Sequence, residues 1–150
     1  MKSLVSFLLL AAFIMLGAEN SLACTCAPVG AAAEELERAT AVFSGKVVEI
    51  KRHKQSGDLF AAVEVVFRVE RAWKGADGRT VSVFTSSHSA ACGYGFRTGR
   101  TYLVYAHGGA DGRLSAGICS RTKRLKDARE DLNALGAGRN VAGGASRVGP

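Results

Sequence analysis

The stretch FAAVEVVFRVERAW, residues 60–73, decides the fold class of this chain of 150 residues. Every second residue in its centre is a bulky apolar one: Val63, Val65, Phe67 and Val69. The residues between them are mostly charged. A period of two is typical of a β-strand with one face in a core and the other in water. We therefore predict a mainly β protein.

Two hairpins extend this pattern. A glycine-containing turn after Lys74 leads into residues 80–85 (TVSVFT), where the period of two resumes, so residues 60–73 and 80–85 are expected to pair. Residues 101–106 (TYLVYA) and 113–119 (RLSAGIC) flank a second glycine-rich turn and predict another hairpin. A fifth strand is expected at residues 41–50, with a bulge or bend at Gly45.

Two helices complete the expected fold. Residues 31–39 (AAAEELERA) are rich in helix formers and predict a short N-terminal helix. Within residues 123–135 apolar side chains recur at helical spacing, and Gly136 follows where a C-terminal cap belongs: Leu125, Ala128, Leu132 and Leu135. Five strands with one short helix before and one after predict a five-stranded OB-like barrel.

The first 23 residues have the pattern of a secretory signal peptide. Lys2 precedes an apolar run, and the small residues Ser21 and Ala23 stand before the expected cut, which would make Cys24 the first residue of the mature protein. Residues 24–136 are then expected to form one domain, and the glycine-rich residues 137–150 a disordered tail. The predicted location is secreted, either extracellular or periplasmic.

A competing interpretation makes Cys24 the acylated cysteine of a lipoprotein, anchored to a membrane. That signal usually has an aliphatic residue where this chain has Ser21. The two interpretations exclude each other, because an acylated Cys24 keeps neither a free α-amine nor a thiol for a disulfide. No membrane contact is expected without this lipid.

The formal net charge is +7, and the basic residues are scattered apart from runs at residues 51–54 and 121–126. We interpret both runs as solvated surface. OB barrels often bind nucleic acid through aromatic platforms, but Tyr102 and Tyr105 should lie on opposite faces of one strand, so no nucleic-acid partner is expected.

All four cysteines, Cys24, Cys26, Cys92 and Cys119, lie after the expected signal peptide. Four cysteines in an exported protein predict two disulfides, for which three pairings are possible. A bond between Cys24 and Cys26 would close a strained ring, so each is expected to reach a distant partner.

The segment Cys24-Thr25-Cys26-Ala27-Pro28, together with Cys92-Gly93-Tyr94 and Cys119, resembles the N-terminal, netrin-like domain of the tissue inhibitors of metalloproteinases. The resemblance covers residues 24–135 and suggests a bacterial-type, secreted, single-domain member. It implies an OB-type barrel, with Cys24 paired to Cys92 and Cys26 to Cys119.

The same resemblance implies a mode of action. The α-amine and carbonyl oxygen of Cys24 would chelate the catalytic zinc of a target metalloproteinase, with Thr25 in the adjoining specificity pocket. Cys26, Ala27 and Pro28 would continue along the cleft. Ala90 and Ala91 would form a second contact segment. The zinc belongs to the target, so no cofactor of the protein's own is expected.

The main alternative is a non-inhibitory netrin-like interaction module, suggested by the small side chains of Ala90 and Ala91 and by the lack of a second cysteine-rich domain. An enzyme is not expected, because the polar residues 86–89 (SSHS) lack the surroundings of a nucleophilic serine. Three histidines lack metal-ligand spacing and are expected on the surface: His53, His88 and His107. A monomer is expected.

Overall fold

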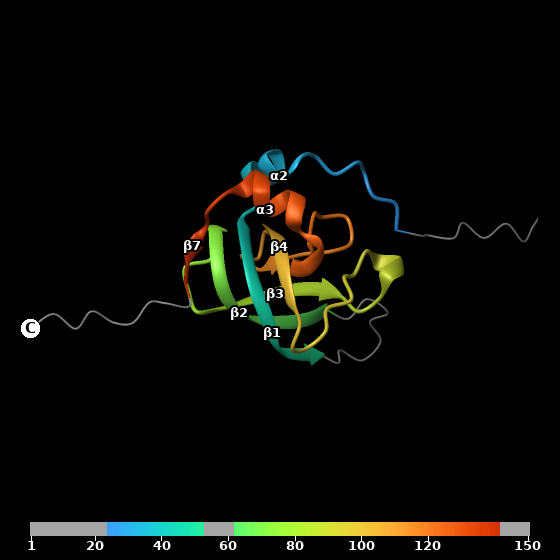
Figure 1. The fold of residues 1–150 in the computed structure, drawn as a ribbon. Helices are drawn as coiled ribbons and strands as arrows, with labels where there is room; N and C mark the ends of the chain where they lie inside the picture. Colours follow the sequence, from blue (N-terminus) through green and yellow to red (C-terminus); the bar gives the residue numbers. More distant parts are fainter. Residues whose placement is uncertain (1–23, 53–61, 142–150) are drawn as a thin grey trace, which may run out of the picture.

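A computed structural model describes residues 24–52 and 62–141 (Figure 1). The expected signal peptide and residues 142–150 lie outside this part of the chain. The longer elements are α2 Ala32–Arg38, β1 Ala41–Arg52, β2 Ala62–Lys74, β3 Thr80–Ser86, β4 Thr101–Gly108 and α3 Arg129–Leu135. The short ones are η1 Ser89–Ala91, β5 Leu114–Ser115, β6 Lys123–Arg124, η2 Leu125–Asp127 and β7 Arg139–Asn140. None of the helices in the described ranges has the length and hydropathy needed to cross a bilayer.

The strands close into a five-stranded barrel in the order β1-β2-β3-β5-β4, because β1 pairs with both β2 and β4. All of these pairings are antiparallel except that of β3 with β5. The predicted OB-like barrel and both predicted hairpins are confirmed. Gly45 lies at a register shift between β1 and β2, as expected, and a Cβ there would stand 2.9 Å from the carbonyl oxygen of Arg68.

The interior of the barrel is apolar and rich in aromatic rings. Val63, Val65, Phe67 and Val69 all point into it, which confirms the alternation in β2. The Phe67 ring lies in edge-to-face contact with Phe43, at 5.5 Å between centroids, and with Phe96, at 5.2 Å. Such pairs add to the burial of apolar area, so Phe67 is the centre of the core.

A second apolar cluster lies outside the barrel, where α2 and α3 pack side by side over β1 and β4 (Figure 1). It contains the four residues that predicted the C-terminal helix, so the helical face is confirmed. The helix nevertheless begins later than predicted. Lys123–Arg124 pair with Tyr102 and Leu103 as β6, because β4 offers a free edge there. Gly136 ends α3 with φ 66°, as the cap prediction requires.

Two other boundaries differ from the predictions. The strand expected at residues 113–119 ends at Ser115, because Gly117 turns to meet Gly93 and Cys119 reaches Cys26. The disordered tail was expected from residue 137, which is wrong for its first part. β7 pairs with β2, and Val141 is buried in the barrel core with its N–H donating to Glu70 O at 3.0 Å. The domain therefore extends to Val141.

Candidate functional site

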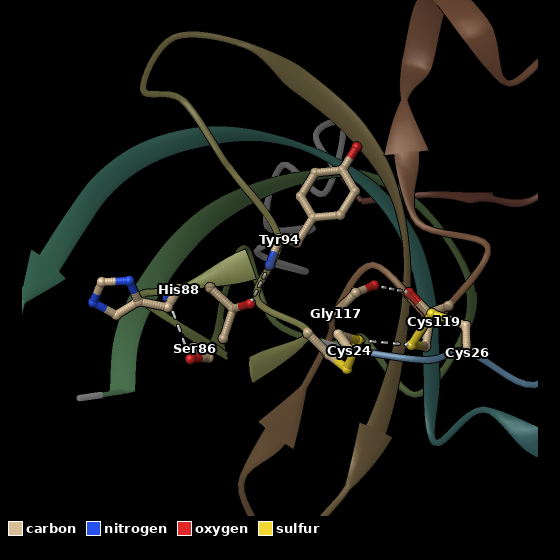
Figure 2. Close-up of a disulfide and its surroundings, with 10 residues drawn as sticks. Cys24, Cys26, Ser86, His88, Tyr94, Gly117 and Cys119 are labelled. Atoms are coloured by element: carbon tan, nitrogen blue, oxygen red, sulfur yellow. Dashed lines mark hydrogen bonds between the residues drawn. A yellow bond between two sulfur atoms is a disulfide. The ribbon is translucent and has the colours of Figure 1, made fainter. Parts of the chain in front are cut away.

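Two disulfides attach the N-terminal segment to the barrel. Cys24 is bonded to Cys92 and Cys26 to Cys119, with Cα–Cα distances of 5.3 and 5.1 Å. These distances lie in the usual range for disulfides, and the pairing is the one that the resemblance implied. The two bridges are stacked, with Cys24 Sγ 3.6 Å from Cys119 Sγ (Figure 2).

Residues 24–31 form no helix or strand and run along the outside of the barrel (Figure 1). Cys24 is half-buried, while the five residues that follow are exposed: Thr25, Cys26, Ala27, Pro28 and Val29. The bonds at Cys24 and Cys26 leave residues 24–26 little conformational freedom to lose on binding. The residues predicted to contact a target are therefore presented on a fixed ridge.

The second predicted contact segment lies beside the first. Ala90 and Ala91 belong to η1, and the Cys24–Cys92 bond brings them next to the N-terminal ridge. Cys92 has φ 59°, which is rare for a residue other than glycine. Its carbonyl accepts the N–H of Ile118 at 3.0 Å. Ile118 is 44% exposed and adds an apolar side chain that the sequence analysis did not identify.

Close backbone packing fixes the turn after Cys92. A Cβ on Gly93 would collide with the carbonyl oxygen of Ser86 and stand 2.9 Å from that of His88. Gly93→Ala should lower the free energy of unfolding by about 1–3 kcal/mol, because backbone cannot move aside cheaply. Gly95→Ala is the matched control, since nothing lies within 4 Å of its Cβ. Chemical denaturation of both variants measures the difference in free energy of unfolding. Equal stability of the two variants would contradict the close packing of backbone around Gly93.

The sulfur atoms of Cys24, Cys26 and Cys119 lie within 4.8 Å of one another, which is close enough for a metal site. All three are oxidised in disulfides, so they offer no thiolate to a metal. His88 and His107 join no cluster of metal-binding side chains in residues 24–52 and 62–141. In Figure 2 the His88 imidazole points away from Ser86, and the Ser86 hydroxyl accepts the His88 backbone N–H at 3.3 Å.

A buried charge network lies behind the N-terminal ridge. The Asp131 carboxylate is fully buried and accepts hydrogen bonds from Arg121 Nε at 2.6 Å, Lys123 Nζ at 2.6 Å and the Tyr105 hydroxyl at 3.1 Å. Arg121 and Lys123 were expected in a solvated basic run, which is wrong for these two residues. Asp131 follows Ala128 by three positions, which places it on the apolar face of the helix. A charged residue on that face was the feature of the sequence that could have predicted a buried ion pair.

These contacts set the ionisation of the network. Burial alone would raise the pKa of Asp131, but the hydrogen bonds from Arg121 and Lys123 outweigh it and hold this pKa below its usual value. Burial, together with the Asp131 charge, raises the pKa of the Tyr105 hydroxyl. The hydrogen bond to Asp131 raises the pKa of Arg121. Asp131 is thus ionised and Tyr105 neutral at neutral pH.

The lowered pKa of Asp131 predicts a loss of stability in acid. The unfolded state takes up this proton at higher pH than the folded state does, so protonation favours unfolding. Above about pH 5, wild type should exceed Asp131→Asn in free energy of unfolding by about 3 kcal/mol, and the gap should close as the pH falls through the folded pKa. Denaturant titrations between pH 2 and 7 measure this gap.

The control for this titration is Asp127→Asn, because Asp127 is 57% exposed. This variant should differ from wild type by less than about 0.5 kcal/mol at neutral pH. A gap between wild type and Asp131→Asn that stays constant down to pH 2 would contradict the role given to Asp131.

Comparison of the chain with protein-family models and with curated proteins gave no match. The geometry of the site therefore carries the functional argument.

Proposed function

We propose that the protein is a secreted inhibitor of zinc metalloproteinases, with Cys24 as the residue that binds the target's zinc. The observation that carries this proposal is the exposed ridge of residues 25–29, held by two disulfides whose first cysteine would be the mature N-terminus. After cleavage before Cys24, an α-amine and a carbonyl oxygen would stand side by side at the tip of this ridge.

The chemistry follows from the open coordination position of a catalytic zinc. A neutral amine nitrogen and a carbonyl oxygen of one residue can occupy that position as a bidentate ligand and displace the attacking water. The Cys24 sulfur takes no part, because it is bonded to Cys92. Thr25 would enter the adjoining pocket, while Cys26, Ala27 and Pro28 line the cleft and Ala90 and Ala91 contact its rim.

Two features of the ridge support a high affinity. Both bridges hold its first residues, 24–26, in place before a target arrives, which lowers the entropic cost of association. Exposed Val29, at the end of the ridge, and exposed Ile118, next to Cys119, add apolar area to this surface. The alternative, a non-inhibitory netrin-like interaction module, would leave proteinase activity unchanged, so inhibition distinguishes the two proposals.

The test is an inhibition assay with mature protein that begins at Cys24, confirmed by intact mass, against a panel of secreted zinc metalloproteinases. We expect inhibition that is mutually exclusive with a small hydroxamate inhibitor on the zinc, and no effect on a serine proteinase. The absence of inhibition across the panel would favour the interaction module. A diacylglyceryl adduct in the mass would refute chelation and indicate a lipoprotein.

A further inference from the structure

Gly30 is the point at which the exposed ridge ends, just before α2. Both of its backbone polar groups are held by side chains from other parts of the chain. Its N–H donates to Glu35 Oε1 at 3.2 Å, and its carbonyl accepts from Arg121 Nη1 at 2.8 Å. Glu35 is itself buried and accepts a further bond from Arg38 at 3.2 Å. The end of the ridge is thus fixed without being part of a helix or strand.

Arg121 is oriented by the buried carboxylate behind it. Its Nε and Nη2 donate to Asp131 at 2.6 and 3.3 Å, which leaves Nη1 to reach the Gly30 carbonyl. The planar guanidinium can make all of these bonds at once, whereas a lysine ammonium cannot match both partners. Asp131 also accepts hydrogen bonds from Lys123 and from the Tyr105 hydroxyl, so the network reaches β4.

Residues 26–30 and 119–121 are therefore tied at two points. The Cys26–Cys119 bond is the covalent tie, and the Arg121–Gly30 contact is the polar one. The disulfide alone allows the exposed residues between Cys26 and Gly30 to pivot. The Arg121–Gly30 hydrogen bond restrains these residues and fixes the direction in which the ridge enters α2.

We propose that Arg121 is a positioning residue for the N-terminal ridge, acting through the Gly30 carbonyl. The effect on inhibition rests on the function proposed above, while the effect on the ridge itself does not. Arg121→Lys keeps a positive charge beside Asp131 and removes the bridge to Gly30. Lys123→Met is the matched control, since it removes the other cation on Asp131 and leaves the Arg121–Gly30 hydrogen bond intact.

The first measurement is amide hydrogen exchange at Gly30 and Ala31, whose N–H groups donate to Glu35 and Glu34, together with the free energy of unfolding of each variant. Arg121→Lys should raise these exchange rates about tenfold under conditions where global unfolding is too rare to contribute. Lys123→Met should lower global stability and leave the same rates unchanged. Unchanged rates in Arg121→Lys, or equal increases in both variants, would overturn the proposal.

The second measurement is the dissociation rate from an inhibited metalloproteinase. Arg121→Lys should dissociate about tenfold faster than wild type and Lys123→Met at the wild-type rate, because a loosened ridge loses its preorganisation. Faster exchange with an unchanged dissociation rate would refute the contribution of Arg121 to inhibition. If wild type inhibits no proteinase, the proposed function fails, and the exchange rates still decide whether Arg121 holds the ridge.

Discussion

Mature protein that carries one extra alanine before Cys24 should inhibit its target at least about a thousandfold more weakly, a loss near 4 kcal/mol. The extension converts the Cys24 α-amine into a peptide nitrogen, which is a poor zinc ligand, and places an added residue where the metal must approach. The inhibition constants of the two forms measure the loss. Undiminished inhibition by the extended form would refute zinc chelation.

Two controls separate this effect from damage to the fold. The extended form should keep both disulfides, and its free energy of unfolding should stay within about 0.5 kcal/mol of wild type. Thr25→Gly keeps the amine and removes only the side chain expected in the specificity pocket, so its loss should be smaller, about tenfold. A Thr25→Gly loss as large as that of the extension would shift the main role from the amine to the pocket.

Replacing Cys26 and Cys119 together by serine should lower the free energy of unfolding by about 3–4 kcal/mol. The sequence separation of this pair is 93 residues, but Cys24–Cys92 remains and already joins neighbouring points of the chain. The additional loop that Cys26–Cys119 closes therefore spans only about thirty residues. The stabilisation expected from this disulfide is calculated for that shorter loop.

Denaturant unfolding of this variant, of the Cys24–Cys92 counterpart and of the variant without either bridge tests the argument. Each single removal should cost a similar amount, and removal of both should cost about 8 kcal/mol, which exceeds the stability of many domains of this size. A single removal that costs as much as the double removal would show that the two bridges act as one unit instead.

The barrel could be predicted because its signals are local. The alternation in residues 60–73 depends only on which side chains enter the core, and the structure places those side chains inside. The helical spacing of Leu125, Ala128 and Leu132 likewise identified the face that covers β4. Gly136 was identified as a cap because a left-handed conformation there favours glycine.

The parts that could not be predicted depend on distant partners. Arg121 lies 91 residues from Gly30 in sequence, and only the folded barrel brings them together. A run with several lysines and arginines has the composition of a solvent-exposed surface. Composition alone does not show which of its side chains forms a buried ion pair. β7 contains two residues, too few for any periodicity, and its pairing follows from the open edge of β2.

The position of β7 has a practical consequence for how this domain can be carried by other molecules. Figure 1 shows β7 on the opposite side of the barrel from the segment, coloured blue, with which the described part of the chain begins. Val141, the last described residue, is anchored in the core there. A cargo protein, surface or label attached beyond it would face away from the ridge. The domain can therefore be tethered through its carboxyl end and still offer its amino-terminal residues to a partner.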